Sequence, residues 1–297
     1  MGCSSHTIQY SMVFAMTATL QTQLTALEQW FHAAPFTIVA FSGGVDSSLV
    51  AYLARHFMGK EQMLATISAS PSLKLSDLDE GKGFCLTHDI PLEIVHTQEL
   101  ENPNYAENPE NRCYFCKHTL YTELVSLAES KNECWILNGT NTDDLGDYRP
   151  GLQAAAEFKV RSPLLECELD KSAVRALAQH FALRCWNKPA SPCLSSRIPY
   201  GQTVTVEKLE RISAGEGFLN QLGFPIVRLR HTENTAVIEV PPDRIADLRL
   251  QTTPITQHMQ SLGFTDCVID DEGFVSGKLN RDLKTKGPMA LPIIQAH

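Results

Sequence analysis

The run FTIVAFSGGVDSSLVAYLARHF, residues 36–57, decides the fold of this 297-residue chain. Its first part, FTIVAFS (36–42), is short, apolar and rich in β-forming residues, which predicts a buried strand. Its last part, SSLVAYLARHF (47–57), has the apolar spacing of a helix. A strand followed directly by a helix is the unit from which parallel sheets are built. This stretch therefore predicts an α/β fold.

Between this strand and helix lies a loop whose residues suit an anionic ligand. Ser42, Gly43 and Gly44 let the backbone pass close to a bound group, which then faces backbone N–H groups and the positive end of the helix. Asp46 can hold Mg²⁺ against phosphates, and Ser47 adds a hydroxyl donor. Two glycines alone are more typical of an ordinary Gly-rich turn, but the full run Ser-Gly-Gly-x-Asp-Ser after a strand is more specific. The Gly-Lys-Thr ending of a Walker loop and the third glycine of a dinucleotide fingerprint are both absent.

Further strands and helices alternate along the first two thirds of the chain, which predicts a parallel sheet with helices on both faces and right-handed crossovers. Strands are expected at 63–69, 91–97 and 134–140, and helices at about 19–33, 76–88, 116–130 and 170–182. The segment LNGTNTDDLGDYRPG (137–151) begins at the carboxyl end of the fourth strand, where such sheets place ligands. Gly139 and Thr140 can approach a nucleotide there. Asp143 or Asp144 can complete a magnesium site, although a solvated acidic turn is as good a reading of either aspartate alone.

The order of the expected helices and strands divides the chain into three regions. Residues 1–18 read as a ragged leader, with Met16 as a candidate start, and residues 19–202 form the α/β domain. After PYGQ (199–202) the expected order is helix, strand, strand, helix and strand, with a possible helix break at Pro254. This order predicts a smaller α+β domain over residues 203–297.

Composition limits the classes of function. The chain has a net charge of −9, 43% hydrophobic and 20% charged residues, and no apolar run long enough to span a membrane. An acidic chain is a poor partner for long nucleic acid. Nine cysteines without a secretion signal argue against a disulfide framework and for a reducing cytoplasm.

Three of the cysteines lie in polar loops where thiols can act. Cys113 and Cys116 form a Cys-x-x-Cys pair just before the helix expected at 116–130, and Cys193 lies in the loop KPASPCLSSRIPYG (188–201). Arg197 is close enough in sequence to stabilise a thiolate at Cys193. The residues alone leave open a three-thiolate iron–sulfur site, a redox pair, or simple packing.

A structural zinc site is a further alternative. Cys85 and His88 form a Cys-x-x-His pair that could join Cys113 and Cys116 as a four-ligand site. Its weakness is that Cys85 and His88 fall three residues apart in an expected helix, where a buried cysteine is common. In this alternative the chain would be a zinc-stabilised nucleotide-binding module without catalysis.

The motifs taken together resemble a known family. SGGVDS resembles the pyrophosphate loop of the PP-loop ATP pyrophosphatases (adenine nucleotide alpha hydrolase-like fold), and that resemblance implies that Ser68, at the end of the second strand, lies near adenosine. Four further segments resemble LarE, the ATP-dependent sulfurtransferase family of nickel-pincer cofactor synthesis. They are NPENRCYFCK (108–117), the segment 139–164, the Cys193 loop and VIDDEGFVSGKLN (268–280). A tRNA-thiolating enzyme of the same superfamily is the competing resemblance.

The resemblance implies a reaction and its cofactors. Members of the LarE family use ATP and Mg²⁺ to adenylate a carboxylate of pyridinium-3,5-biscarboxylic acid mononucleotide, and then exchange AMP for sulfur. In one form of the family a single cysteine at the position of Cys193 gives up its own sulfur. In the other, three cysteines hold a 4Fe–4S cluster, which the presence of Cys113, Cys116 and Cys193 implies here. The expected protein partners are further copies of the chain, as a homo-oligomer, and other enzymes of nickel-pincer biosynthesis.

The substrate is an anionic nucleotide, so the chain needs a site for its phosphate. VRLRH (227–231) places Arg228 and Arg230 on one face of a strand, because side chains alternate with period two. Two guanidinium groups can hold a phosphate bidentately, and the resemblance assigns these positions that role. More weakly supported contributors to substrate binding are Ser196, Arg197, Glu216 and Glu239.

Overall fold

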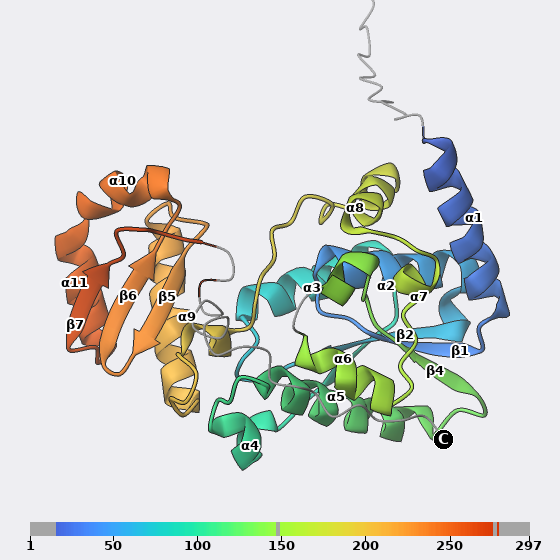
Figure 1. Cartoon of the computed structure of the whole chain (residues 1–297), viewed down its shortest axis with the longest axis horizontal. Helices are drawn as coiled ribbons and strands as arrows, with labels where there is room; N and C mark the ends of the chain where they lie inside the picture. The colour runs from blue at the N-terminus through green and yellow to red at the C-terminus, as the bar shows by residue number, and fades with distance from the viewer. Residues whose placement is uncertain (1–15, 147–148, 276–277, 279–297) are drawn as a thin grey trace, which may run out of the picture.

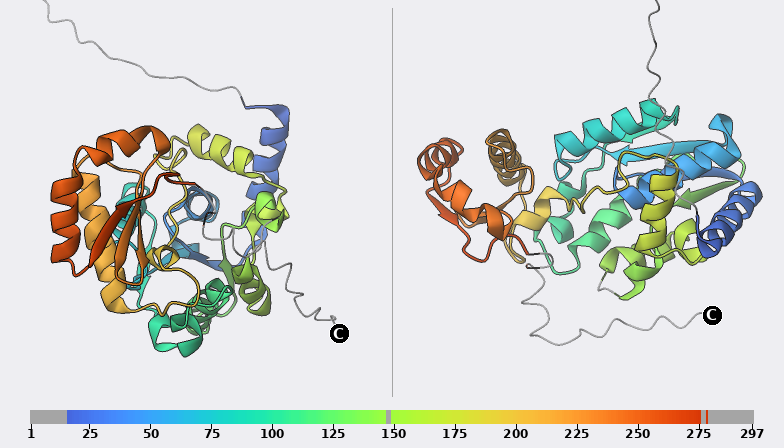
Figure 2. Two further views of the ribbon diagram at one scale, coloured as in Figure 1. Left: turned by 60° about the vertical axis from the view of Figure 1, so that its left-hand side comes forward. Right: turned by 90° about the horizontal axis from the view of Figure 1, so that it is seen from above.

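A computed structural model describes residues 16–146, 149–275 and Lys278 of the chain. Figures 1 and 2 show a larger unit, with helices on both sides of a parallel sheet, and a smaller unit beside it that ends the described chain. The predicted α/β class of the first part is confirmed. Most of the predicted leader, residues 1–15, lies outside the described residues. No described helix combines the length and the apolar character needed to cross a membrane.

The larger unit is built on four parallel strands in the order β3-β2-β1-β4. Their bounds are Phe36–Ala40 for β1, Met63–Ser68 for β2, Leu92–Val95 for β3 and Cys134–Leu137 for β4. The chain leaves β1 toward β2 on one side and later returns to pair β4 on the other side. The strand order therefore reverses between β1 and β4, and a ligand crevice is expected outside their carboxyl ends.

Helices cover both faces of this sheet because the strands bury side chains on both sides. In β1, Val39 packs with helices on one face, and Ile38 and Ala40 pack with helices on the other. The first face is covered by α1 (Ala18–Ala33), α2 (Val45–Met58), α3 (Leu75–Thr87), α7 (Pro163–Glu166) and α8 (Lys171–His180). The second is covered by α5 (Arg112–Ala128) and α6 (Pro150–Glu157).

Helix α5 begins four residues earlier than expected from the sequence. The prediction began it at residue 116, whereas the structure begins it at Arg112, with Asn111 as the N-cap residue. The short helix α4 (Pro103–Ala106) and the turn that follows position this start. Cys113 and Cys116 therefore lie inside the first turns of a helix rather than in the loop before it, which corrects their predicted setting.

The smaller unit has a sheet and a core of its own. Strand β5 (Arg228–Thr232) pairs antiparallel with β6 (Thr235–Glu239), which pairs parallel with β7 (Asp266–Ile269). Helices α9 (Val206–Gln221), α10 (Ile245–Arg249) and α11 (Thr252–Ser261) complete this unit. The predicted helix break at Pro254 is wrong, because the helices separate at Leu250 and Gln251. Pro254 lies in the first turn of α11, where its missing N–H has no helical partner to lose.

A separate apolar cluster joins the two units. It contains Tyr105 of α4 and two residues of the Cys193 loop, Leu194 and Ile198. These side chains pack against Leu209 and Ile212 of α9. This contact fixes the start of α9 against the larger unit. The domain boundary at residues 202 and 203 stays a prediction, and the bridging cluster shows that the chain is packed on both sides of it.

Buried His231 on β5 makes the stability of the smaller unit sensitive to acid. The side chain is 1% exposed, and neither ring nitrogen has a hydrogen-bond partner. Burial, together with the charges of Lys208 and Arg211, lowers the pKa of His231 below its usual value of 6.5. The folded state therefore binds fewer protons than the unfolded state, so stability is complete above about pH 6.5 and decreases as pH falls below it.

We expect His231→Phe to flatten the fall of Tm between about pH 6.5 and pH 5, because it removes this proton linkage. Thermal unfolding followed by circular dichroism at several pH values measures the effect. For a chain of this size, each kcal/mol corresponds to roughly 2–4 °C in Tm. The exposed His96 supplies the matched control, His96→Phe. Equal slopes for wild type and His231→Phe would contradict the assignment.

Candidate active site

The loop between β1 and α2 has the backbone geometry of an anion site. Gly43 has φ +71°, which favours glycine, and Gly44 is the N-cap residue of α2. The Ser42 N–H donates to Ser47 Oγ at 3.1 Å, and the two hydroxyl oxygens lie 3.0 Å apart. The side chains of the loop therefore hold one another and leave the first-turn N–H groups of α2 available to phosphate.

The loop after β4 packs directly against this first turn. A Cβ atom on Gly139 would lie 2.7 Å from the Ser47 nitrogen and 2.9 Å from the carbonyl carbon of Asp46. Only a residue without a side chain fits this approach. Thr140 follows, with its N–H bonded to Asn138 Oδ1 at 3.0 Å. The structure thus brings together the two predicted nucleotide segments, which are almost 100 residues apart in sequence.

The carboxylate of Asp46 lies where these two segments meet. Its Oδ1 accepts from Asn141 Nδ2 at 3.0 Å, and its Oδ2 forms an ion pair with Lys171 Nζ. The backbone N–H of Lys171 donates to Asp143 Oδ2 at 3.2 Å. Lys171 therefore sets a positive charge beside Asp46, with Asp143 bonded to its backbone. Asp46 and Asp143 thus both contact Lys171, one through its ammonium group and the other through its backbone N–H, and their role as magnesium ligands stays a prediction.

Of the two candidate aspartates after β4, Asp143 is the better placed to meet a metal. Asp143 is exposed, whereas Asp144 is buried, accepts the Asn141 N–H at 3.1 Å and pairs with Arg149 at 2.8 Å. At the next strand end, the hydroxyl of Ser68 lies 2.5 Å from that of Thr97. Ser68 thus occupies the same carboxyl edge of the sheet as the phosphate loop.

The three candidate thiols lie near one another. Cys113 and Cys116 are three residues apart on α5, and Cys193 is the N-cap residue of the short helix Leu194–Arg197. Solvent reaches Cys113, although protein surrounds it on most sides. Burial and the charge of Cys193 raise the pKa of Cys113, and burial raises the pKa of Cys116 to about 12. The thiols are thus close enough for their charges to interact.

Two cations not expected from the sequence, Arg112 and Lys117, act on Cys113. Arg112 and Lys117 are the groups whose charge favours the ionised form of Cys113. Arg197 instead donates from Nη1 to the backbone oxygens of Pro192 and Cys193, at 2.7 and 3.1 Å, and is fully buried. The guanidinium of Arg197 thus holds the backbone of the Cys193 loop, and its predicted effect on the Cys193 thiolate stays a prediction.

The described residues contain no group of three or more cysteine, histidine or acidic side chains arranged around a single metal ion. The zinc alternative fails on this ground, and Cys85 explains why. Cys85 is packed in the core between α3 and the sheet, where burial raises its pKa to about 12. His88 packs its ring against Tyr52 and Phe84 instead.

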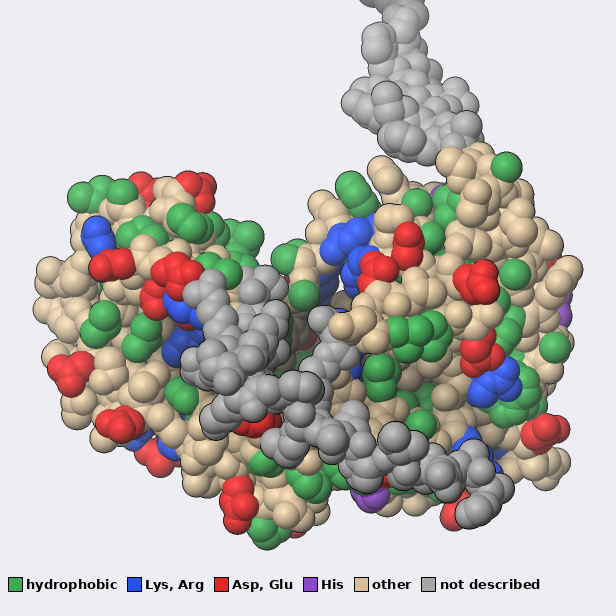
Figure 3. All heavy atoms as spheres, viewed as in Figure 1, with side chains coloured by type: hydrophobic (Ala, Val, Ile, Leu, Met, Phe, Trp, Pro, Cys, Tyr) green, Lys and Arg blue, Asp and Glu red, His purple; other side chains and the backbone are tan. Residues whose placement is uncertain are grey.

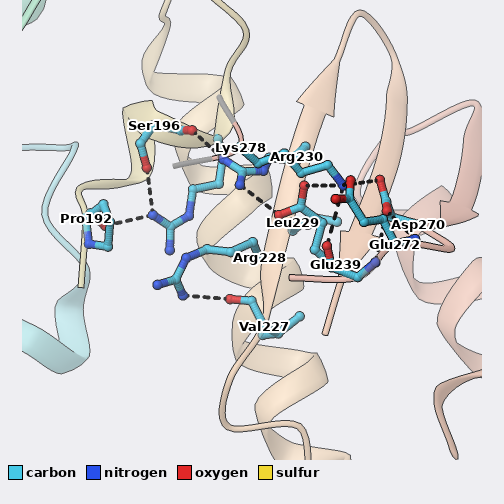
Figure 4. A network of polar contacts seen from close by, with 12 residues as sticks. Pro192, Ser196, Val227, Arg228, Leu229, Arg230, Glu239, Asp270, Glu272 and Lys278 are labelled. Carbon is cyan, nitrogen blue, oxygen red and sulfur yellow. Dashed lines mark hydrogen bonds and ion pairs between the residues drawn. The ribbon is translucent and has the colours of Figure 1, made fainter. Parts of the chain in front are cut away.

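Arginines from two segments gather opposite the cysteine loop, as Figure 4 shows for Arg228 and Arg230 of β5. Arg228 is 8% exposed and donates to the Val227 oxygen at 3.0 Å and the Ala190 oxygen at 3.2 Å. Arg230 donates to the Ser196 oxygen at 2.8 Å. Burial and the nearby charge of Arg197 lower the pKa of Arg228 to about 10. Like charges held together in this way favour an anionic ligand.

Two buried glutamates organise these arginines. Glu216 pairs with Arg197 at 2.8 Å and Lys74 at 2.6 Å, and accepts the Leu229 N–H at 3.1 Å. Glu239 pairs with Arg230 at 2.7 Å. Their carboxylate oxygens are used by protein groups, so both glutamates position cations. Their predicted contact with substrate stays a prediction, as does that of Ser196, whose hydroxyl donates to the Cys193 oxygen at 2.7 Å.

The sequence reading missed several charged residues of the site, because isolated lysines and arginines carry no local signal. Lys278 reaches the same network from the end of the described chain, and it lies 2.7 Å from Asp270 and 3.6 Å from Glu239 (Figure 4). The missed residues are Lys74, Arg112, Lys117, Lys171 and Lys278.

Comparison with known proteins identifies the family. A family model for NAD synthase matches residues 19–106, the part that holds the phosphate loop. Pyridinium-3,5-bisthiocarboxylic acid mononucleotide synthase of Lactiplantibacillus plantarum is 36% identical over 92% of this chain and 99% of its own length. This chain belongs to the LarE family. An uncharacterized protein of Synechocystis sp. is 44% identical over 89% of the chain and 99% of its own length.

Membership of the LarE family gives the enzyme class, an ATP-dependent sulfurtransferase with a PP-loop domain. More distant similarity extends to a tRNA-specific 2-thiouridylase of Clostridium beijerinckii, 22% identical over 63% of this chain and 62% of its own length. The similarity to the LarE relative covers both structural units, whereas the NAD synthase match covers only the first part of the larger one. The smaller unit and the cysteine loop are therefore part of what this chain shares with the LarE relative.

Proposed function

We propose that the chain adenylates a carboxylate of pyridinium-3,5-biscarboxylic acid mononucleotide and converts it to a thiocarboxylate in nickel-pincer cofactor synthesis. One observation carries this proposal. Arg228 and Arg230 bond the backbone of the segment that carries Cys193, at Ala190 and Ser196. A cationic site that could hold a substrate phosphate therefore adjoins the loop whose thiol would supply or hold sulfur.

In the first step, the PP-loop binds the β- and γ-phosphates of ATP, and Asp46 and Asp143 would hold the Mg²⁺ that offsets their charge. A substrate carboxylate oxygen attacks the α-phosphorus, the bond to the bridging oxygen breaks, and pyrophosphate leaves. The product is an acyl-adenylate, whose AMP is a far better leaving group than oxide. Lys171 lies beside Asp46, so Mg²⁺ and the ammonium group would share the charge of the phosphates.

In the second step, sulfur replaces AMP. With Cys193 as donor, its thiolate attacks the acyl carbon and AMP leaves, which forms a thioester. Loss of the Cys193 α-proton then breaks the Cβ–S bond and gives the thiocarboxylate and dehydroalanine. Cys113, Cys116 and Cys193 would hold a 4Fe–4S cluster, which supplies an inorganic sulfide as the nucleophile when bound. The proximity of the three thiols to one another supports the route in which the sulfur comes from a cluster.

Substrate-dependent release of pyrophosphate tests the proposal. Full-length protein, ATP and Mg²⁺ are incubated with the pyridinium biscarboxylate mononucleotide, and pyrophosphate and AMP are measured together. Nicotinic acid mononucleotide has only one carboxylate, so the rate of pyrophosphate release with it tests whether the second carboxylate is needed for recognition. The proposal fails if the biscarboxylate substrate releases no pyrophosphate above the rate with ATP alone.

Thiolation of tRNA is the second candidate, because the similarity to the 2-thiouridylase extends over 63% of this chain. The net charge of −9 opposes it, and the described basic and acidic side chains are interspersed over the face shown in Figure 3. Pyrophosphate release that depends on tRNA, rather than on the pyridinium nucleotide, would favour this candidate. We further propose that the enzyme works in the reducing cytoplasm as a homo-oligomer, alongside other enzymes of the same biosynthesis.

Arg228→Ala is expected to raise KM for the pyridinium substrate roughly 10- to 100-fold, about 1.4–2.8 kcal/mol, and to leave KM for ATP nearly unchanged. The reason is that a charge-assisted bond to the substrate phosphate is lost, while the PP-loop lies on the other unit. Initial rates of pyrophosphate release measure both constants. Arg249→Ala is the matched control, since Arg249 is 57% exposed and pairs with Asp271 rather than with the Cys193 loop. An unchanged substrate KM would exclude Arg228 from phosphate binding.

A further inference from the structure

Glu99 is a buried carboxylate in an unusual setting. It is 1% exposed and begins the short 3₁₀ helix Glu99–Glu101, which follows β3. Burial of a charged carboxylate is unfavourable unless a cation or several hydrogen-bond donors compensate it. Among the described residues no lysine or arginine pairs with Glu99, and its two oxygens accept hydrogen bonds from hydroxyl groups instead. What this side chain controls is therefore the direction of those hydrogen bonds.

The two oxygens of Glu99 fix the protons of two hydroxyl groups. Ser72 Oγ donates to Oε1 and Thr97 Oγ1 donates to Oε2, both at 2.8 Å. An ionised carboxylate has acceptors only, and a hydroxyl group has a single proton to donate. The protons of Ser72 and Thr97 are therefore both committed to Glu99. Toward any further neighbour, each of these hydroxyl groups can only accept.

Two partly exposed serines are those further neighbours. Ser68 Oγ lies 2.5 Å from Thr97 Oγ1, and Ser70 Oγ lies 2.8 Å from Ser72 Oγ. Because Thr97 and Ser72 cannot donate, Ser68 and Ser70 are the donors of these two hydrogen bonds. Each of the two serines has then used its only proton inside the protein, and it presents lone pairs alone to a ligand.

Ser68 lies at the edge of the sheet that carries the phosphate loop. Ala40 of β1 pairs in parallel with Thr66 of β2. Ser42, which begins the phosphate loop, and Ser68 are each two residues beyond this pair, so they occupy equivalent positions at the ends of neighbouring strands. A nucleotide whose phosphates bind the loop therefore has the Ser68 oxygen on the adjoining strand.

We propose that Glu99 is a positioning residue that makes Ser68 a hydrogen-bond acceptor for the nucleoside of ATP. Ser68 then selects a ligand group that donates. ATP carries donors of two kinds, the exocyclic amine of adenine and the hydroxyl groups of ribose. Glu99 does not touch the nucleotide and acts through Thr97, which holds the Ser68 proton away from the ligand. The inference deepens the proposed function and rests on its first step, the binding of ATP.

Binding of ATP analogues that each lack one donor tests the inference without turnover. Isothermal titration calorimetry of the full chain, with Mg²⁺ and without the second substrate, gives Kd for ATP and for three analogues. Purine riboside triphosphate lacks the amine, and 2′-deoxy-ATP and 3′-deoxy-ATP each lack one ribose hydroxyl. The readout is the ratio of the analogue Kd to the ATP Kd. General damage to the fold weakens all four ligands alike, so it cancels in this ratio.

In the wild-type protein we expect at least one analogue to bind about 3- to 10-fold more weakly than ATP, the effect of one lost hydrogen bond. In Glu99→Met, Thr97 is free to donate to Ser68, so the ratio for that analogue should fall toward one. Glu101→Met is the matched control, because Glu101 is an exposed glutamate of the same short helix, and it should keep the wild-type ratio. Wild-type ratios near one for all three analogues, or an unchanged ratio in Glu99→Met, overturn the inference.

A second variant gives the answer if Glu99→Met does not fold. Thr97→Val removes the hydroxyl that connects Glu99 to Ser68 and keeps a branched side chain, so the same ratio should fall toward one. An unchanged ratio in Thr97→Val overturns the inference. The calorimetry uses no pyridinium nucleotide, so a failure of substrate-dependent pyrophosphate release would leave the binding ratios intact. The failure of the proposed function and the failure of this inference are therefore distinguishable.

Discussion

Cys193→Ala is expected to abolish thiocarboxylate formation, with a loss of at least about 1,000-fold, while substrate-dependent pyrophosphate release continues. Cys193 is the residue that both sulfur routes require, either as the donor itself or as the third thiolate of a cluster. The PP-loop that forms the adenylate is in a different part of the site, after β1. Mass spectrometry of the nucleotide product and a pyrophosphate assay measure the two half-reactions separately.

The matched control is Cys267→Ala, which removes another half-buried thiol that lies outside the cysteine site. Normal thiocarboxylate formation by Cys193→Ala would show that sulfur enters by a path that does not involve this loop. Simultaneous loss of pyrophosphate release would show that the loop is also needed for adenylation.

Cys113→Ala then separates the two sulfur routes. If Cys193 gives up its own sulfur, the Cys113→Ala variant still completes one turnover per chain. Cys193 then becomes dehydroalanine, and the chain becomes lighter by roughly 34 Da, the mass of the H₂S that elimination removes. If three thiolates hold a cluster, Cys113→Ala loses iron, inorganic sulfide and sulfur transfer together. Iron analysis of anaerobically purified protein and the intact mass after one turnover give opposite patterns for the two routes.

Gly139→Ala is expected to lower ATP-dependent pyrophosphate release about 100-fold, because a displacement of the phosphate loop by a fraction of an ångström misaligns the α-phosphorus. The added Cβ would meet backbone atoms, at 2.7 Å from the Ser47 nitrogen, and backbone cannot move aside as a flexible side chain can. Overpacking of this kind also destabilises a fold by about 1–3 kcal/mol. Steady-state rates at saturating ATP, with Tm as a second readout, measure the effect.

Gly146→Ala is the control for this substitution. Gly146 belongs to the same connection after β4, but a Cβ atom there would have no neighbour within 4 Å. It should therefore retain wild-type rates. Equal losses in the two variants would mean that the connection needs flexible backbone in general rather than a close approach at Gly139.

The larger unit could be predicted closely because its signals are local. The apolar run of β1, the glycine turn and the helical spacing of α2 lie within 22 consecutive residues, so periodicity and turn chemistry identify each of them. The start of α5 could not be found in this way. Arg112 is not a typical first-turn residue, and it is held there by its burial and by its bond to the oxygen of Ser195, more than 80 residues later.

The roles of the charged residues show a similar division. Arg228 and Arg230 were predicted as a pair because they alternate on one strand, and they lie together in the structure. Arg197 was predicted to act on the Cys193 thiol because it is only four residues away, yet its guanidinium is fixed by Glu216 and the loop backbone. Short sequence separation does not give side-chain direction, since that depends on which buried acceptor the guanidinium can reach.

By itself, then, the sequence of this chain determined the phosphate loop, the parallel sheet, the family and the three thiols, because each depends on residue type and on spacing over a few positions. Only the tertiary structure decided which charged side chains lie close enough to interact. It placed Lys171 beside Asp46, Glu216 between Arg197 and Lys74, and Arg112 against the loop that carries Cys193. Electrostatic interactions act through space, and these partners are brought together by folding rather than by their order along the chain.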